Sequence, residues 1–181
     1  MQSEPLLHRR SSTGFTLIEL LTTVAIIAIM LAFAVPSFQE FNVNYRTSVQ
    51  ANDLLADLAL ARNEAVKFAR PTVVRAESGD WSDGWIVGTD LNGDGNITGD
   101  EIVKRHGEAE QGFNIFGGDN AGNAGTQVQF GITGQLMLPA VPAEFAICRP
   151  DNDPVKSRGI RVEGTGRAAT QKAADNTGMS C

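Results

Sequence analysis

The sequence predicts an α+β protein, in which one long N-terminal helix packs on a head of antiparallel strands. An apolar run near the start passes into helical periodicity that lasts to residue 70. After residue 71, short apolar stretches alternate with Gly, Asn and Asp, as in strands joined by turns. The 181 residues suit a single domain. A net charge of −6 disfavours general attraction of the surface to nucleic acid or anionic lipid.

Residues 15–35 are predicted to form a single membrane-spanning helix. The residues of this stretch that are not apolar are Thr16, Glu19, Thr22 and Thr23. At about 1.5 Å per residue the helix reaches about 31 Å, the thickness of the hydrocarbon core of a bilayer. Because Arg9 and Arg10 precede it, the positive-inside rule predicts a cytoplasmic leader and an outward-facing remainder.

The site of processing is expected before the apolar run. A secretory signal peptide has a small-residue cleavage site after its apolar stretch, but here Pro36, Ser37 and Phe38 follow. The small residue Gly14 lies immediately before the run. The apolar segment is therefore expected to remain in the mature chain.

The stretch Gly14-Phe15-Thr16-Leu17-Ile18-Glu19-Leu20, after a short basic leader, resembles the class III signal of type IV pilins and type II secretion pseudopilins. The resemblance implies that a prepilin peptidase removes residues 1–14 by cutting between Gly14 and Phe15, and that Phe15 is then N-methylated. It also implies a bacterial inner-membrane protein with a periplasmic head that later joins a pilus or pseudopilus. Its partners would be the peptidase and other major and minor pilins or pseudopilins.

Glu19 is the candidate assembly residue. A carboxylate inside a membrane span costs about 3 kcal/mol on insertion scales, so it requires a partner or a role. Cleavage would create a cationic α-amino group at Phe15, which could pair with Glu19 of a neighbouring subunit. The alternative is a carboxylate that reaches the interface near the helix end.

Residues 36–70 are expected to continue the helix as an amphipathic half that ends at Arg70-Pro71. Pro36 predicts a bend or a short melted turn near residues 32–36. Apolar residues recur at three- and four-residue spacing, and the second half of this helix is predicted to pack on the head. The recurring residues are Phe38, Phe41, Tyr45, Ala51, Leu54, Leu55, Leu58, Ala61, Ala65 and Phe68. Polar residues are predicted on the other faces: Gln50, Asp53, Asp57 and Glu64.

Residues 71–181 are expected to form the β-rich periplasmic head. Strands are predicted at 72–76, 85–89, 102–106, 113–116, 127–130, 135–138, 144–148 and 160–163. Alternation predicts that one face of the sheet buries Val128, Phe130, Phe145, Ile147, Ile160 and Val162. Together with the helix these strands give the pilin-like fold that the leader implies.

The soluble part resembles the GspH/FimT group of minor pilins and pseudopilins, which includes FimU-like proteins. The residues that carry this resemblance are Ala61 to Lys67, Trp81 to Trp85, the Asp90 to Gly95 turn, Phe130 to Gly134, Phe145 to Cys148 and Gly166-Arg167. The resemblance implies a non-enzymatic subunit that primes assembly at or near a filament tip. A type IV pilus is favoured, and a GspH-type pseudopilin of a type II secretion system is the alternative.

Residues 90–101, DLNGDGNITGDE, match the spacing of a calcium-binding loop. The expected ligands are Asp90, Asn92, Asp94, the Asn96 carbonyl and Glu101, with Gly95 at the turn. Strand-like sequences flank the loop, whereas an EF-hand has helices there. The alternative is a β-hairpin loop in which Asn, Asp and Gly supply turn conformations.

Two further features lie in the C-terminal part. Cys148 and Cys181 are expected to form a disulfide in an oxidising compartment. Arg158, Arg161 and Arg167 are candidate contacts to DNA, as in a minor pilin for natural transformation, but Gly166-Arg167-Ala168-Ala169 lacks the second arginine of the Gly-Arg-x-Arg element. A solvated face with ordinary charges is the favoured alternative.

The sequence offers no catalytic motif. Outside the leader, His106 is the one histidine, and no nucleophile motif, Walker loop or dinucleotide fingerprint accompanies it. His106 is predicted to be a surface strand residue. No cofactor is expected, with calcium as the exception.

Overall fold

The computed structural model describes residues 14–94 and 96–181. Residues 1–13 of the predicted leader at 1–14, with Arg9 and Arg10, lie outside the described residues, as does Gly95 of the predicted calcium loop. The chain divides into two compact units at Phe41 and Asn42. The second unit holds all the strands.

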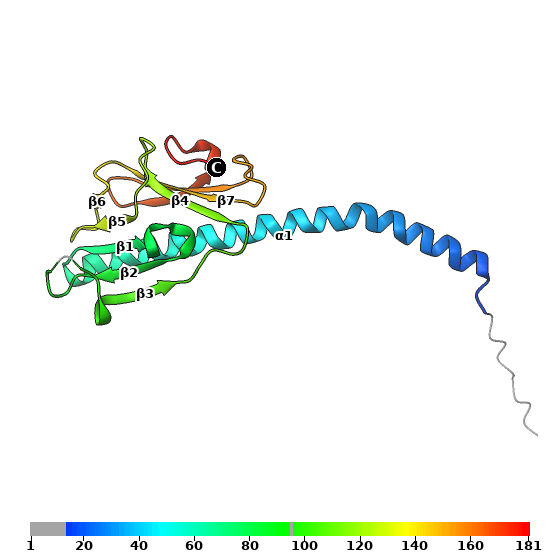
Figure 1. Cartoon of the computed structure of the whole chain (residues 1–181), viewed down its shortest axis with the longest axis horizontal. Helices are drawn as coiled ribbons and strands as arrows, with labels where there is room; N and C mark the ends of the chain where they lie inside the picture. The colour runs from blue at the N-terminus through cyan, green and yellow to red at the C-terminus, as the bar shows by residue number, and fades with distance from the viewer. Residues whose placement is uncertain (1–13, 95) are drawn as a thin grey trace, which may run out of the picture. The chain divides into compact units, whose positions relative to one another are not determined.

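Helix α1 spans Leu17–Phe68 and is the long blue-to-cyan helix in Figure 1. It runs through Pro36 without interruption, so of the two alternatives predicted there, a bend or a melted turn, the melted turn is wrong. A proline removes only one backbone hydrogen bond, and the many bonds on either side keep the helix continuous. The helix ends two residues before Arg70, where Ala69 adopts a φ of 48°.

The buried face of α1 runs from Thr47 to Ala65. It confirms the predicted inward positions Ala51, Leu54, Leu58, Ala61 and Ala65, which are at most 1 % exposed. In the first half of the amphipathic stretch Phe38, Phe41 and Tyr45 are exposed, and so is Phe68 at its end. The buried stripe is thus shorter than the periodic pattern, in agreement with the prediction that the second half of the helix packs on the head, although Phe68 lies beyond its end.

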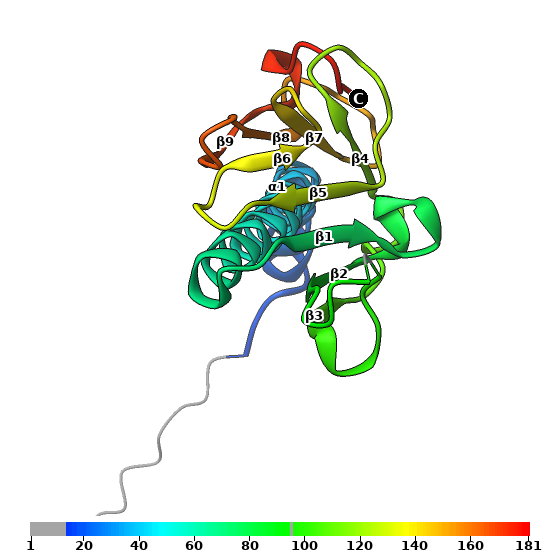
Figure 2. The same ribbon diagram turned by 90° about the vertical axis from the view of Figure 1, so that its left-hand side faces the viewer.

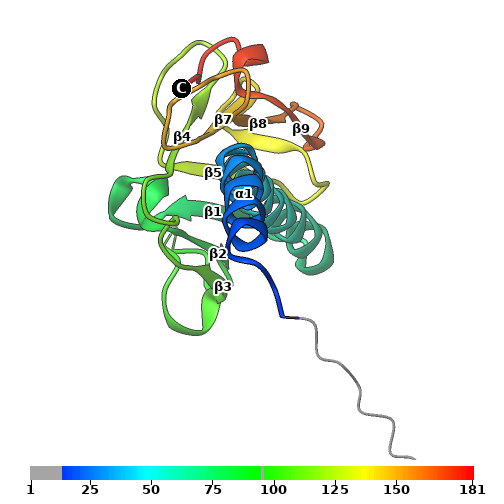
Figure 3. The ribbon, with the colours of Figure 1, turned by 90° about the vertical axis from the view of Figure 1, so that its right-hand side faces the viewer.

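In the part of the chain that the structure describes, nine strands form two antiparallel sheets, seen from two sides in Figures 2 and 3. The first sheet has the order β3-β2-β1-β5-β6, with β1 Thr72–Ala76, β2 Trp85–Thr89, β3 Ile102–His106, β5 Gln127–Phe130 and β6 Leu136–Leu138. The second has the order β4-β7-β8-β9, with β4 Asn114–Asp119, β7 Ala143–Cys148, β8 Arg158–Val162 and β9 Ala168–Lys172. Short 3₁₀ turns complete the head, among them η3 Gly99–Glu101 and η4 Ala173–Asp175.

The predicted strands are confirmed in place, and four of them (β1, β2, β3 and β5) have the predicted bounds. β4 begins one residue later than expected and extends to Asp119. β9 was missed, because Ala168–Lys172 shows no apolar alternation and pairs with β8 at the edge of the sheet.

The main core lies where α1 packs on both sheets. All six predicted core residues of the strands are at most 2 % exposed: Val128, Phe130, Phe145, Ile147, Ile160 and Val162. A second, smaller cluster lies on the other face of β7, where Ala146 and Cys148 meet Ala173, Met179 and Cys181. The C-terminal tail therefore covers a sheet face that would otherwise be open to solvent.

Two of the polar residues that were predicted on the other faces of α1 are buried. Asp57 is 1 % exposed and Gln50 is 6 % exposed. The Asp57 carboxylate is tolerated because Trp85 Nε1 donates to it at 2.9 Å and Lys104 Nζ at 2.6 Å. Partners of this kind come from other elements, so the helix sequence alone gives no sign of them.

Candidate functional site

The first part of α1 is an apolar surface. Large apolar side chains from Phe15 to Val35 are all exposed, Phe15 by 82 % and Val35 by 49 %. Within residues 14–94 and 96–181, α1 is the one helix long and apolar enough to cross a membrane, and none of its apolar window is buried. Contiguous apolar surface of this size marks a membrane or protein contact. We call residues 15–35 the apolar segment.

The start of the helix is capped and its approach is open. Gly14, Phe15 and Thr16 precede the helix and are exposed. Thr16 Oγ1 accepts a hydrogen bond from the Glu19 amide at 3.2 Å, which satisfies one free N–H of the first turn. The Gly14–Phe15 bond thus lies in accessible, non-helical backbone.

Glu19 stands in the first turn of α1, where the helix dipole favours a negative charge. Its backbone carbonyl accepts hydrogen bonds from Thr22 and Thr23 at 3.0 and 2.9 Å. Its carboxylate makes no ion pair with any residue in the described part of the chain. The arrangement leaves this acid available to a group from outside the chain.

The loop at 90–101 is held by its own backbone. Glu101 is 7 % exposed, and its carboxylate accepts hydrogen bonds from the amides of Leu91, Asn92 and Thr98. Asp90 accepts one from the Gly93 amide at 2.6 Å.

The remaining polar residues of the loop behave in the same way. The side chains of Asn92 and Asp94 accept from the amides of Asp94 and Asn96, at 2.8 and 2.7 Å. No group of three or more His, Cys, Asp or Glu side chains converges anywhere in the described residues. The side chains of Asp90, Asn92, Asp94 and Glu101 therefore all accept hydrogen bonds from backbone amides of the loop.

The three candidate arginines do not share one surface. Arg158 lies on the α1 side of β8, in register with Ile160 and Val162, whereas Arg161 lies on the opposite face. Arg161 lines a cavity of about 240 Å³ together with Glu163 and Arg167. Two acids hold the Arg161 guanidinium, Glu144 and Glu163, each at 2.7 Å.

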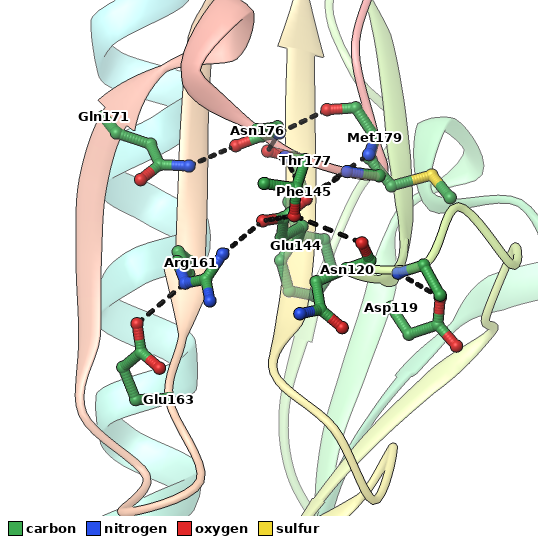
Figure 4. A network of polar contacts seen from close by, with 12 residues as sticks. Asp119, Asn120, Glu144, Phe145, Arg161, Glu163, Gln171, Asn176, Thr177 and Met179 are labelled. Atoms are coloured by element: carbon green, nitrogen blue, oxygen red, sulfur yellow. Dashed lines mark hydrogen bonds and ion pairs between the residues drawn. The ribbon is translucent and has the colours of Figure 1, made fainter.

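Glu144 is the centre of a network that the sequence did not indicate (Figure 4). It is fully buried on β7, and its carboxylate accepts hydrogen bonds from the amides of Thr177 at 2.9 Å and Gly178 at 2.7 Å, besides its ion pair with Arg161. Asn176 adds a hydrogen bond from Nδ2 to the Phe145 carbonyl at 2.9 Å. The network ties the C-terminal tail to the second sheet.

The charge of Glu144 is stabilised where it lies. Burial raises the pKa of this carboxyl, but hydrogen bonds from Gly178, Thr177 and Met179 outweigh it and leave the pKa below its usual value. The pKa of Arg161 is raised further, chiefly by its hydrogen bond to Glu163. Both groups are therefore charged at neutral pH.

The disulfide between Cys148 and Cys181 is present, as predicted, with the two Cα atoms 5.5 Å apart. It joins the end of β7 to the last residue of the chain. The disulfide and the Glu144 network together attach the C-terminal tail to the second sheet at two places. The cysteines could be found from the sequence. Glu144 could not, because its partners are backbone amides of the tail and Arg161 on another strand, which no local pattern brings together.

Three motif residues that lie far apart in the sequence meet at one end of α1. Arg62 Nε donates to the Gly134 carbonyl at 2.9 Å, and its NH2 group donates to the Thr165 carbonyl at 3.2 Å. Gly166 has a φ of 77°, and a Cβ there would lie 1.8 Å from the Gly134 carbonyl oxygen. These residues thus serve packing between α1 and two loops.

Trp81 and Trp85 are core residues. Trp81 meets Phe145 edge to face, with ring centroids 4.8 Å apart. Trp85 stacks on His106 at 4.0 Å, so His106 is not the plain surface residue expected. Its Nδ1 lies 3.8 Å from Asp57, a buried carboxylate that the helix pattern had placed outside. The cluster serves to join α1 to β2 and β3.

Two family models match the chain. One, described as Type II transport protein GspH, matches residues 50–166, well over half of the sequence. The other, described as the prokaryotic N-terminal methylation motif, matches residues 9–35. Among curated proteins, none matches the sequence.

Solved structures show the same fold. The type IV minor pilin FimU of Pseudomonas aeruginosa is 22% identical, with a TM-score of 0.59 over 75% of this chain and 95% of that one. The minor pseudopilin EpsH of the type II secretion system of Vibrio cholerae is 14% identical, with a TM-score of 0.54 over 72% of this chain and 99% of that one. A long helix packed on antiparallel sheets, the predicted fold class, is thereby confirmed.

Proposed function

The chain belongs to the GspH family of minor pilins and pseudopilins, and from this premise we propose that it is a non-enzymatic minor subunit that takes part in priming or tip assembly of a type IV pilus. The observation that carries the proposal is the apolar segment of α1, none of which is buried within the chain. Such a helix requires lipid before assembly and other helices afterwards.

The subunit is first held in the bacterial inner membrane, with a cytoplasmic leader and a periplasmic head. Prepilin peptidase cuts between Gly14 and Phe15 and methylates the new terminus. Support comes from the exposed, non-helical backbone at residues 14–16 and from the methylation motif at residues 9–35. The disulfide at Cys148 agrees with a head in an oxidising compartment.

Glu19 sets the register of assembly. Its carboxylate, which has no ion-pair partner among the described residues, binds the α-amino group of Phe15 from a neighbouring subunit. In the low dielectric of packed helices, breaking such a pair costs about 3–5 kcal/mol. The remaining partners are the other major and minor subunits of the filament.

A pseudopilus of a type II secretion system is the second candidate, because the family model carries the description of a type II transport protein. Both filaments use the same leader and helix. The subunits recovered with the chain from assembled filaments distinguish the two systems.

The test compares Glu19→Val with a matched control, Glu108→Val, which removes an exposed acid from the head. We expect both variants to insert in the membrane and to be processed, while incorporation of Glu19→Val into sheared filaments falls more than about tenfold. Mass spectrometry of the native chain should show N-methylated Phe15 as its first residue. Normal incorporation of Glu19→Val, or an unprocessed start, would overturn the proposal.

A further inference from the structure

A polar cavity lies between α1 and the edge of the second sheet, within the head. It has a volume of about 210 Å³ and is lined by Ser48, Ala51 and Asn52 of α1, Arg158 of β8 and Thr170 of β9. A guanidinium, an amide and two hydroxyls therefore face one small space. The volume accommodates a carboxylate or phosphate group, not a large ligand.

Several donors in this cavity are unused. Across the part of the chain that the structure describes, Arg158 has no ion pair, and the side chains of Asn52 and Thr170 have no hydrogen-bond partner. The Ser48 hydroxyl donates to the Asn44 carbonyl at 2.9 Å. Arg161, three residues further along β8, is held by two acids, so the two arginines of this strand differ in what they have available.

A second cation stands beside the cavity. Arg158 is directly opposite Lys172 in the register of β8 and β9, so both side chains leave the sheet on the same face. Lys172, too, has no acidic partner in the described residues. Like charges opposite each other on paired strands are destabilising, and a bound anion relieves this repulsion.

We infer that this cavity is an oxyanion pocket that binds one side-chain carboxylate of a neighbouring filament subunit, with Arg158 and Lys172 supplying the charge and Asn52 and Thr170 the hydrogen bonds. This inference rests on the proposed function for its source of the carboxylate. The pocket would form one contact between the head and an acidic side chain on the surface of that neighbour.

Charge distribution favours a single carboxylate over a nucleic-acid backbone. The chain carries a net charge of −6, which opposes a long polyanion. Binding of DNA requires several cations along one surface, but Arg161 and Arg167 lie in the cavity on the other face of the sheet. Two neighbouring cations, Arg158 and Lys172, are sufficient for one carboxylate group.

The binding test uses the full-length ¹⁵N-labelled chain in detergent micelles, titrated with N-acetyl-glutamate N-methylamide and followed by NMR. We expect saturating shifts at Asn52 and Thr170, and a dissociation constant at least about tenfold weaker for Arg158→Gln. Lys172→Gln, outside the cavity lining, is expected to weaken binding about threefold. Arg167→Gln on the opposite face is the matched control and should change nothing.

Each other outcome opposes the inference. Equal shifts with the glutamine analogue, or unchanged binding by Arg158→Gln, would show that charge is not recognised. Tighter binding of inorganic phosphate and of duplex DNA at physiological salt, lost in Arg158→Gln, would replace the carboxylate by a phosphate backbone. If Arg158→Gln fails to fold, as Trp85 fluorescence would reveal, Arg158→Lys is used instead, and it should bind more weakly than the native chain.

A second measurement separates this inference from the proposed function. In cells, Arg158→Gln should be processed normally but enter sheared filaments several-fold less than Arg167→Gln. Absence of the native chain from filaments would contradict the proposed function, whereas binding of the carboxylate probe by the purified chain would still stand. Normal filament entry of Arg158→Gln would overturn the assembly role of the pocket.

Discussion

The two parts of helix α1 use apolar residues in opposite ways. In the part that belongs to the head, Leu54 and Leu58 are fully buried against the two sheets. In the apolar segment the equally apolar Ile27 and Leu31 are 54 % and 53 % exposed. One continuous helix thus carries apolar residues that stabilise the fold and apolar residues that are free to contact lipid or other protein chains.

The head, by contrast, provides hydrogen-bond partners for most of its buried polar side chains. The buried acids Asp57, Glu101 and Glu144 all accept hydrogen bonds from within the chain. Gln50 is an exception, since neither polar atom of its buried amide has a partner among the described residues. The difference teaches that the head satisfies most of its buried groups from within the chain, whereas the side chains of the apolar segment remain exposed.

The largest expected effect separates the two parts of the helix. Leu54→Ala should lower the free energy of unfolding by about 2–5 kcal/mol, because it leaves a cavity in the main core. The matched Leu31→Ala should leave it within about 0.5 kcal/mol, because its side chain is exposed. Denaturant unfolding in detergent, followed by the fluorescence of Trp81 and Trp85, measures both. Equal losses of unfolding free energy in the two variants would show that the two parts of the helix do not differ in their contribution to stability.

The second test removes the covalent attachment of the tail. Replacing Cys148 and Cys181 by Ala should cost about 2–4 kcal/mol, because the unfolded chain is no longer constrained and the small cluster around Ala146 and Ala173 loosens. Thermal unfolding with and without reductant provides the same comparison on the native chain. An unchanged melting temperature would mean that the Glu144 network alone holds the tail.

The third test concerns the buried charge of Glu144. Glu144→Gln should cost about 1–3 kcal/mol, because charge-assisted hydrogen bonds to the tail and to Arg161 become weaker. The pKa of Glu144 is lowered in the folded state, so its contribution is complete above the unfolded value of about 4.3 and is lost as pH falls through the folded value.

Stability measured between pH 7 and pH 3 checks this sign. The native chain should lose more stability on acidification than Glu144→Gln, which has no carboxyl to protonate at this position. Identical pH profiles would show that the network does not depend on the charge.

The smallest expected effect is at the loop 90–101. Because Asp90, Asp94 and Glu101 accept backbone hydrogen bonds, excess chelator should shift the melting temperature by less than about 1 °C. The control is the same melt with added Ca²⁺. If chelator lowers the melting temperature and added Ca²⁺ restores it, the loop binds calcium. The head would then depend on a bound ion as well as on its own hydrogen bonds.

Much of the fold was predictable because its signals are local. Alternation placed Phe145, Ile147 and Ile160 in the core, and the helical period found Leu54 and Leu58. The same rules failed where no local signal exists. β9 lacks alternation, and the burial of Asp57 depends on Trp85 and Lys104 from other strands.

The candidate sites divide in the same way. The leader motif and Glu19 stand out because a carboxylate in an apolar run is costly. Arg158, Arg161 and Arg167 look alike in the sequence, yet the pleat of β8 sends the first two to opposite faces and acids engage only one of those two.

The sequence by itself determined that this chain has a membrane-length apolar helix, a β-rich head and a processing motif, since hydropathy and periodicity are properties of neighbouring residues. Tertiary structure alone decided which of the two arginines of β8 is engaged by acids, why a buried glutamate is stable and how the tail covers the second sheet. Those outcomes depend on contacts between side chains and backbone amides that are dozens of residues apart in the sequence. A local sequence pattern carries no information about such contacts.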